Sequence, residues 1–183
     1  MNPITIKAIP LTTARLILRA YQSGDEIALF HDYFNDAAAS QYLQRQPHQS
    51  IDQTKKALEN WALYKWHNAD AEFMWIIADH VNGNAMGILI LMQQDDFAEI
   101  HFGLGQIHQR QGLMLEAVHA VIEYVKKQTT LRGISSFCAT QHSQSQKVFV
   151  RSGFQHIEHL PHHAIFPALS EAPQDCVRYA ITW

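Results

Sequence analysis

The segment HFGLGQIHQRQGLMLEAVHAVIEYVKK, from His101 to Lys127, restricts the fold of this chain more than any other segment. It opens as a strand, passes through a polar turn around Gly112 and continues as a long amphipathic helix. The first N–H groups of a helix lack intrahelical partners, and the helix dipole adds positive potential at that end. The turn is therefore suited to bind an anion, and a phosphorylated cofactor is the first candidate.

Strand and helix patterns also alternate through the N-terminal half. RLILRAY, which begins at Arg15, alternates apolar and polar residues as a half-buried strand does, and the following SGDEIALF offers Ser23 as a helix N-cap. NDAAASQYLQR predicts a short helix. SIDQTKKALENWALYKWHN predicts a longer helix capped by Ser50, with an apolar side formed by Ala57, Leu58, Trp61, Ala62 and Tyr64.

Strands dominate the rest of the chain. FMWIIADHVNGNAMGILILM has two apolar runs around Asn82, Gly83 and Asn84, which predicts a hairpin, and FAEIHFGLG predicts a third strand. After the long helix, ISSFCAT predicts a buried strand, SQSQKVFVRSG a helix that Gly153 ends, and FQHIEHL and CVRYAITW the closing strands. A mixed, curved sheet with helices on its faces follows, in an α/β or α+β domain.

Composition narrows the class of partner. The chain has 183 residues, 47% of them apolar, so we expect a single domain over residues 1–183. Its net charge of −3 gives no bulk electrostatic case for a nucleic-acid partner. Cys138 and Cys176 stand far apart and form neither a disulfide framework nor a zinc-site spacing, which favours reduced cytosol. No signal core or bilayer-spanning apolar run is visible, so we expect a cytoplasmic protein with no membrane partner.

The order of these segments resembles the GNAT superfamily of acetyl-CoA-dependent N-acetyltransferases, and within it the branch of ribosomal-protein N-terminal alanine acetyltransferases. TTARLILRAY is similar to the family's opening strand, FMWIIADHVNGNAMGILILM to its central hairpin and FAEIHFGLG to its fourth strand. The resemblance covers almost the whole chain. It implies a GNAT-like fold with a curved, mostly antiparallel sheet of about six or seven strands and helices on both faces. It also implies acetyl-CoA as co-substrate and no metal. A homodimer is compatible with the resemblance, which leaves the oligomeric state open.

The family's cofactor signature is Gln or Arg, two residues, Gly, one residue, then Gly or Ala. It falls on Gln109, Gly112 and Met114 in QRQGLM, and the last position departs from the pattern. The resemblance implies that main-chain N–H groups cradle the pyrophosphate of coenzyme A, which needs no particular side chain. The residues concerned are Gln109, Arg110, Gln111, Gly112, Leu113 and Met114. Arg110 either pairs with a phosphate or is a solvated residue at the helix start.

A second signature, Asn-x-x-Ser or Ala in a helix that ends in Gly-Phe, is similar to the segment around SQSQKVFVRSGF. Ser145, Gly153 and Phe154 match it, whereas His142 stands where asparagine is usual. Many members place a tyrosine in this helix to protonate the leaving thiolate, but the matching residue here is Phe149. The acid is then Ser145, a bound water or another tyrosine, or the thiolate leaves unaided. The resemblance places His142, Ser145 and Phe149 beside the cofactor.

Acetyl transfer needs a neutral amine, yet an α-amine has a pKa of roughly 7.7–8.0 and a lysine amine about 10.4. Glu99 resembles the general-base glutamate of some members, and partial burial would raise its pKa. His101 points to the same strand face and is a second candidate base. The alternative for Glu99 is a solvent-facing or ion-paired acid. Strand N–H groups from Phe102 to Leu104 would polarise the acetyl carbonyl during direct amine attack in a ternary complex.

Other residues receive structural interpretations. We expect Cys138 and Cys176 to pack in the core and to carry no acyl group. His156 and His159 would lie on opposite faces of a strand, so the four histidines of QHIEHLPHH, which include His162 and His163, would edge the acceptor cleft or the solvent and bind no metal. Most of the candidate pocket aromatics would also be core residues; they are Trp61, Tyr64, Trp66 and Trp75.

Three classes of function follow. The leading one is an acetyl-CoA-dependent N-acetyltransferase whose acceptor is a protein N-terminus or a small-molecule amine. The second is a GNAT-like module that binds coenzyme A with little or no turnover, which Met114, His142 and Phe149 favour. The third is a structural α/β domain whose QRQG turn is an ordinary helix start. Coenzyme A binding separates the third from the others, and amine-dependent thiol release separates the first from the second.

Overall fold

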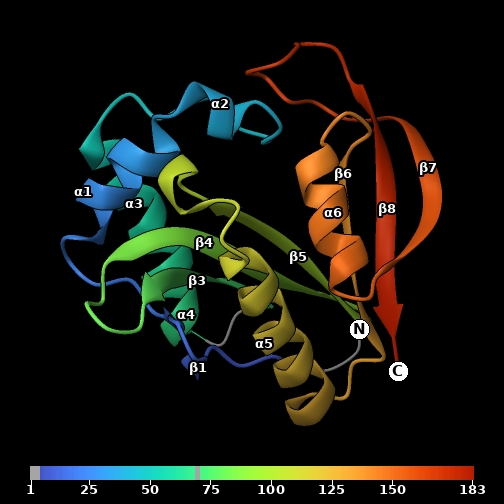
Figure 1. Ribbon diagram of the computed structural model, residues 1–183, viewed down its shortest axis with the longest axis horizontal. Helices are drawn as coiled ribbons and strands as arrows, with labels where there is room; N and C mark the ends of the chain where they lie inside the picture. The colour runs from blue at the N-terminus through green and yellow to red at the C-terminus, as the bar shows by residue number, and fades with distance from the viewer. Residues whose placement is uncertain (1–4, 69–70) are drawn as a thin grey trace.

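The computed structural model describes residues 5–68 and 71–183, and the described residues form one eight-stranded sheet (Figure 1). The strand order is β1-β2-β3-β4-β5-β6-β8-β7, and the strands pair antiparallel except β5 with β6. The bounds are β1 Leu11–Thr12, β2 Leu16–Arg19, β3 Glu72–Asp79, β4 Ala85–Gln94, β5 Phe97–Leu104, β6 Gly133–Ala139, β7 Gln155–Ala164 and β8 Gln174–Thr182. The mostly antiparallel mixed sheet is confirmed. The strand beyond the expected seven is β1, whose two residues are too few to show a period.

Helices cover both faces of this sheet, as expected. They are α1 Asp25–Leu29, α2 Ala37–Ser40, α3 Ile51–Glu59, α4 Lys65–His67, α5 Leu113–Gln128 and α6 Ser143–Arg151. Two π-helical turns, η1 Phe30–Phe34 and η2 Asn60–Tyr64, extend α1 and α3, and a 3-10 turn, η3 Gln106–His108, precedes α5. Helices α1 to α3 lie on one side of the strands, and α5 and α6 lie on the other (Figure 1). Helix α4 follows η2, and its Trp66 packs against the core under α5. No helix within the described ranges has the length and apolar character needed to cross a bilayer.

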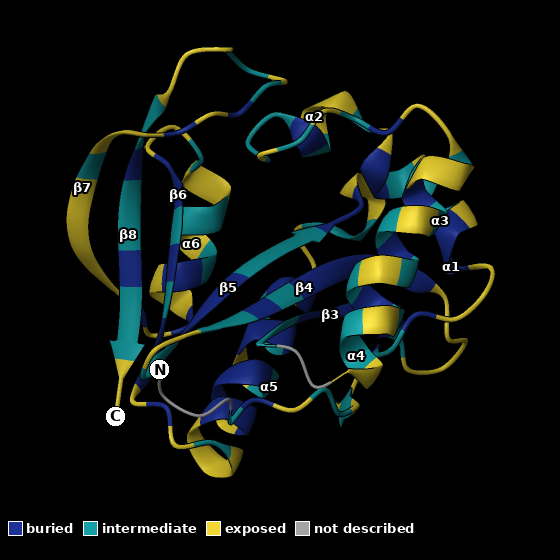
Figure 2. Ribbon diagram, turned by 180° about the vertical axis from the view of Figure 1, so that it is seen from behind, coloured by how far each residue is buried: buried dark blue, intermediate teal, exposed yellow. Residues whose placement is uncertain are grey.

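The sheet separates two apolar layers because side chains alternate along its strands. In β3, Phe73 and Trp75 pack in the core under α5, while Met74 and Ile76 pack in a second core under α1 and α3. Figure 2 shows the buried central strands, with exposed residues on the outer sides of the helices and on β7. Tyr64 is 61% exposed, so its predicted place on the apolar side of the helix is wrong. The π-helical turn shifts the helical period there.

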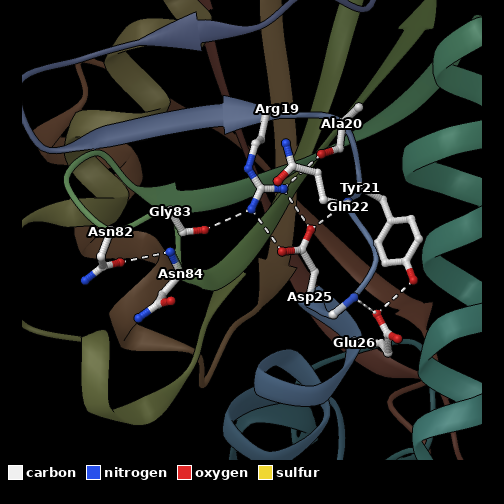
Figure 3. Close-up of polar contacts among 10 residues, drawn as sticks. Arg19, Ala20, Tyr21, Gln22, Asp25, Glu26, Asn82, Gly83 and Asn84 are labelled. Atoms are coloured by element: carbon white, nitrogen blue, oxygen red, sulfur yellow. Dashed lines mark hydrogen bonds and ion pairs between the residues drawn. The ribbon is translucent and has the colours of Figure 1, made fainter.

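An ion-paired network fixes the entry to α1 (Figure 3). The Arg19 guanidinium donates to Asp25 Oδ2 at 2.7 Å and Oδ1 at 2.9 Å, and to the Gly83 carbonyl at 2.9 Å. It therefore joins β2, α1 and the β3–β4 turn. The predicted N-cap Ser23 is wrong, because the cap residue is Gly24, whose φ of 105° favours glycine. Carboxylates inside the helix accept the N–H groups before it instead.

The sheet splits between β5 and β6. Their register includes two residue pairs, Ala98 with Ile134 and Glu99 with Ser135, after which the two strands diverge (Figure 1). A serine side chain makes one more link, from Ser136 Oγ to the Ile100 carbonyl at 2.6 Å. Beyond that point, each strand presents an edge that the other does not cover.

Candidate active site

A cavity of about 420 Å³ lies where β5 and β6 separate. Its walls come from both layers of helices and from the two diverging strands. Most lining side chains are apolar or aromatic, and the carboxylate and guanidinium groups among them belong to Glu99 and Arg45. The structure gathers six of the side chains that the sequence singled out, namely Glu99, His101, Phe102, His142, Ser145 and Phe149.

The side chains of Glu99 and His101 form a hydrogen-bonded pair on the cavity face of β5. Glu99 Oε1 lies 2.8 Å from His101 Nε2, and the Glu99 side chain is 8% exposed whereas that of His101 is 30% exposed. Arg178 Nη1 of β8 lies 4.0 Å from Glu99 Oε2. The solvent-facing alternative for Glu99 is therefore excluded, whereas the ion-paired alternative agrees with these two contacts. Both side chains line the cavity, and the hydrogen bond between the more exposed histidine and the buried carboxylate is suited to relay a proton.

Backbone groups of β5 face the split. The Ile100 carbonyl faces β6, because it accepts the hydrogen bond from Ser136 Oγ. Backbone direction alternates along a strand, so the N–H groups of Phe102 and Leu104 lie on the same edge, beyond the last paired residue, Glu99. The structure thus brings together a pair of donors and the acid–histidine pair at one end of the cavity. These are the groups that a reacting carbonyl and an attacking amine need.

The turn before α5 has the geometry of an anion-binding loop. Arg110 has φ 62° and Gly112 has φ 77°, both in the left-handed region. The first intrahelical bond runs from Glu116 N–H to the Gly112 carbonyl at 3.1 Å. The N–H groups of residues 110–115 have no acceptor in the part of the chain that the structure describes. Successive unpaired N–H groups in such a turn form a concave site for phosphate.

The side chains of this turn mostly support its shape. Gln109 Nε2 donates to the Leu104 carbonyl at 3.0 Å, and Gln111 Nε2 donates to a carbonyl of η3 at 3.0 Å. Leu113 and Met114 are buried in the core under α5. Met114 therefore points away from the turn and leaves its backbone open, although glycine or alanine is usual at that position. The exposed Arg110 side chain is compatible with both of its predicted roles.

Helix α6 supplies the other side of the reaction site. Ser145 Oγ lies 3.1 Å from His142 Nδ1, and the His142 ring stacks on Tyr42 with centroids 4.5 Å apart. Burial lowers the pKa of His142 from 6.5 to about 4, so the imidazole is neutral near pH 7. It can offer a neutral hydrogen-bonding group where asparagine is usual. Phe149 is 2% exposed and packs against Phe102 with centroids 5.3 Å apart.

Comparison with known proteins decides the family. A model of the acetyltransferase (GNAT) domain family matches residues 15–155, which is most of the chain. The chain belongs to this family. It is an acetyl-CoA-dependent N-acetyltransferase, with acetyl-CoA as its co-substrate. A search of the curated proteins found no match.

Solved structures with this fold are numerous. A GNAT-family acetyltransferase from Bacillus anthracis has a TM-score of 0.81 and 17% identity, over 95% of this chain and 98% of that one. A Salmonella typhimurium acetyltransferase that modifies the N-terminal serine of ribosomal protein L7/L12 has a TM-score of 0.79 and 20% identity, over 93% of this chain and 96% of that one. Spermidine N-acetyltransferase from Vibrio cholerae, in complex with CoA and spermine, has a TM-score of 0.75 and 21% identity, over 93% of this chain and 96% of that one. The expected GNAT fold is confirmed.

Arg15 clamps the turn before α5, a contact that the sequence did not predict. Arg15 Nη1 donates to the Gln111 carbonyl at 2.9 Å, and Arg15 Nε lies 2.7 Å from Glu116 Oε2. Thr13 Oγ1 also donates to Glu116, at 2.6 Å. The segment between β1 and β2 therefore holds the first turn of α5 in this acetyltransferase. The contact joins residues about 100 positions apart, and no local pattern signals it.

The cavity wall formed by η1 and the loop after α2 was also missed. Tyr33, Tyr42, Arg45 and His48 line it. The helix predicted over NDAAASQYLQR ends at Ser40, so Tyr42 and Arg45 lie in the loop that follows it. Gly103 of β5 permits this wall to close on the sheet, since a Cβ there would lie 2.2 Å from Tyr33 Oη. This wall of the cavity therefore depends on tertiary contacts that form only in the folded chain.

The remaining predicted aromatic residues divide between cavity and core. Trp61 lines the cavity, whereas Trp75 is fully buried and Trp66 packs against it. Cys138 and Cys176 are both buried, as predicted, but Cys138 also borders the cavity. Burial raises the pKa of the Cys138 thiol to about 12, which disfavours a nucleophilic thiolate.

Two histidines of β7 contact different partners. His159 Nε2 is 3.6 Å from Asp175 Oδ2, and His163 meets the cavity residue Phe137 edge to face at 4.7 Å. Strand β7 continues through Pro161 to Ala164, so His162 and His163 belong to it, contrary to the expected end at Leu160. Among residues 5–68 and 71–183, no group of three or more His, Cys, Asp or Glu side chains could hold a metal ion.

Proposed function

We propose that this acetyltransferase transfers the acetyl group of acetyl-CoA to a primary amine by direct attack in a ternary complex. The observation that carries the proposal is the Glu99–His101 pair, which lies in the cavity beside the uncovered edge of β5. The acceptor is a protein N-terminus or a small-molecule amine. Both kinds are acetylated by proteins of similar fold, the L7/L12 acetyltransferase and spermidine N-acetyltransferase.

Coenzyme A would bind at the turn and along the split. The unpaired N–H groups of residues 110–115 would hold its pyrophosphate. Its amide-bearing arm would follow the uncovered edge of β5, where a strand edge offers main-chain hydrogen bonds. The thioester carbonyl would then meet the N–H groups of Phe102 and Leu104, which stabilise the negative charge that develops on its oxygen.

The amine must lose a proton before or as it attacks. His101 Nε2 is shared with Glu99, so a proton that reaches the imidazole is stabilised by the buried carboxylate. The neutral nitrogen attacks the carbonyl carbon and the C–N bond forms. As the C–S bond breaks and coenzyme A leaves as a thiolate, the nitrogen loses its second proton to water, which also restores the proton of any side chain that protonates the thiolate. Ser145, whose hydroxyl is held by His142, is the nearest side-chain candidate to protonate that thiolate, in competition with water.

The proposal is tested by thiol release from acetyl-CoA with a panel of N-terminal peptides and small amines. We expect release that depends on one class of amine and disappears in Gly112→Trp, because a large side chain at a positive φ would occupy the phosphate turn. Circular dichroism of Gly112→Trp checks that the variant is folded. Coenzyme A binding without release for any amine would favour the alternative, a binding module with little or no turnover.

A further inference from the structure

The cavity contains a cation that has no carboxylate partner among the described residues. Arg45 Nη1 donates to the carbonyls of Phe34 and Gln46, each at 3.1 Å, and to Ser40 Oγ at 3.3 Å, which are all neutral groups. The guanidinium carbon lies 4.6 Å from the Phe34 ring centroid and 5.3 Å from the Tyr33 ring centroid, and the Tyr33 hydroxyl is the electrostatic neighbour of the guanidinium. These contacts place the guanidinium among neutral groups, and none of them supplies a negative charge.

A buried cation of this kind is costly without an anion. Burial lowers the pKa of Arg45 from its ordinary value, yet a guanidinium stays protonated in proteins. Arg45 lines the cavity, so an anionic ligand bound there can supply the counter-charge that the surrounding neutral groups do not.

The other ionisable groups that line the cavity do not neutralise Arg45. Burial raises the pKa of Tyr33, so its hydroxyl beside the guanidinium stays uncharged near pH 7. Glu99 pairs with His101 and lies near Arg178. His48 Nδ1 is 2.9 Å from Thr54 Oγ1, and burial, with a smaller contribution from Arg45, lowers the pKa of His48 to about 4. His142 is likewise neutral near pH 7. The positive charge of Arg45 is therefore available to a ligand.

We propose that the amine acceptor also carries a carboxylate, and that Arg45 binds this carboxylate. The inference rests on the proposed acetyl transfer in the same cavity. The planar guanidinium matches a carboxylate through parallel N–H donors. An α-carboxylate of an amino acid and an acidic side chain near a peptide N-terminus share this chemistry. Polyamines do not, because their additional positive charges would meet Arg45 and its low-dielectric surroundings.

The test compares matched acceptors that differ in one charge. The first pair is phenylalanine and phenylalaninamide, whose ring suits the apolar lining. The second pair is a tetrapeptide amide that begins with serine and aspartate, and its counterpart with asparagine. Spermidine is the fifth acceptor. We expect kcat/KM to favour the acidic member of at least one pair by about 10- to 100-fold, the range of one charge-assisted hydrogen bond.

Three variants assign the preference. Arg45→Gln should abolish the ratio between acidic and neutral acceptors, and Arg45→Lys should keep part of it by keeping the charge. Lys126→Gln removes the same charge from an exposed site on α5 and should leave the ratio unchanged. The amines of a matched pair can differ in pKa, but that difference is the same for every protein. The comparison of wild type with variant therefore cancels it.

A failure of the proposed role of Arg45 can be distinguished from a failure of acetyl transfer itself. Equal rates within both pairs, a preference for spermidine, or an unchanged ratio in Arg45→Gln would overturn the role of Arg45 while transfer itself stands. If no amine is acetylated, transfer fails, and calorimetric Kd values of the same acceptors for the protein saturated with coenzyme A still decide Arg45. A preference in the phenylalanine pair alone identifies an α-carboxylate, and one in the peptide pair alone identifies an acidic N-terminus.

Discussion

Glu99 can be tested with a substitution that changes its chemistry and little of its shape. Glu99→Gln removes the proton acceptor behind His101, so we expect kcat to fall about 10²- to 10⁴-fold, the usual contribution of general base catalysis. Coenzyme A affinity should stay the same, because the phosphate-binding turn is separate. Steady-state kinetics and calorimetry give the two values. Glu123→Gln is the control, since Glu123 is exposed on α5, pairs with Lys127 and is not a residue of the cavity lining. A wild-type kcat in Glu99→Gln would eliminate this base.

Two buried histidines predict acid sensitivity. The pKa values of His48 and His142 are lowered from 6.5 to about 4 in the folded protein, mainly by burial. Between these values the unfolded chain binds more protons than the folded one, so their contribution to stability is complete above pH 6.5 and is lost as the pH falls toward 4. We expect Tm to fall between pH 7 and pH 5. His142→Asn, which keeps a neutral hydrogen-bonding group beside Ser145, should reduce that fall. An equal fall in wild type and variant would contradict the buried neutral imidazole.

The start of α5 depends on a contact from a distant segment. Arg15→Gln removes the bond to the Gln111 carbonyl and the ion pair with Glu116, so the turn would lose part of its fixed shape. We expect coenzyme A to bind about 3- to 10-fold more weakly, as for one lost hydrogen bond, with an unchanged KM for the amine. Calorimetry and kinetics measure both. Arg132→Gln is a matched control, because Arg132 is similarly exposed and has its own ion pair with Asp96. Equal affinities of the two variants for coenzyme A would show that Arg15 does not hold the turn in its binding shape.

Strands and the long helix were predictable because their signals are local. The runs around Gly83 identify β3 and β4, and the turn at Gly112 places the start of α5 within one residue. Gly24 replaced Ser23 as the cap because the acids of α1 pair with Arg19 and with the backbone before the helix. The extension of β7 beyond Pro161 arises from pairing with β8, which sequence periodicity does not record.

The candidate active site was predictable only where its residues lie in segments with a local pattern. Glu99, His101 and Ser145 lie in segments whose pattern places them relative to the sheet, and the cavity unites them. Arg45 and Tyr33 come from loops and π-helical turns whose position depends on packing across the sheet, so no local pattern identifies them. Under the proposed function, the cavity joins a cofactor side built from family-like motifs to an acceptor side built from contacts of this particular chain.

In the whole molecule, the cavity and the turn before α5 serve one reaction under the proposed function, direct transfer from acetyl-CoA to an amine. A single turnover with acetyl-CoA that carries ¹³C in its acetyl group, followed by mass spectrometry of both the amine and the protein, tests it most directly. We expect the label on the amine nitrogen, in an amount equal to the thiol released, and none on the protein. Label on Cys138 or another side chain would contradict direct attack, and unlabelled amines throughout the panel would contradict transfer itself.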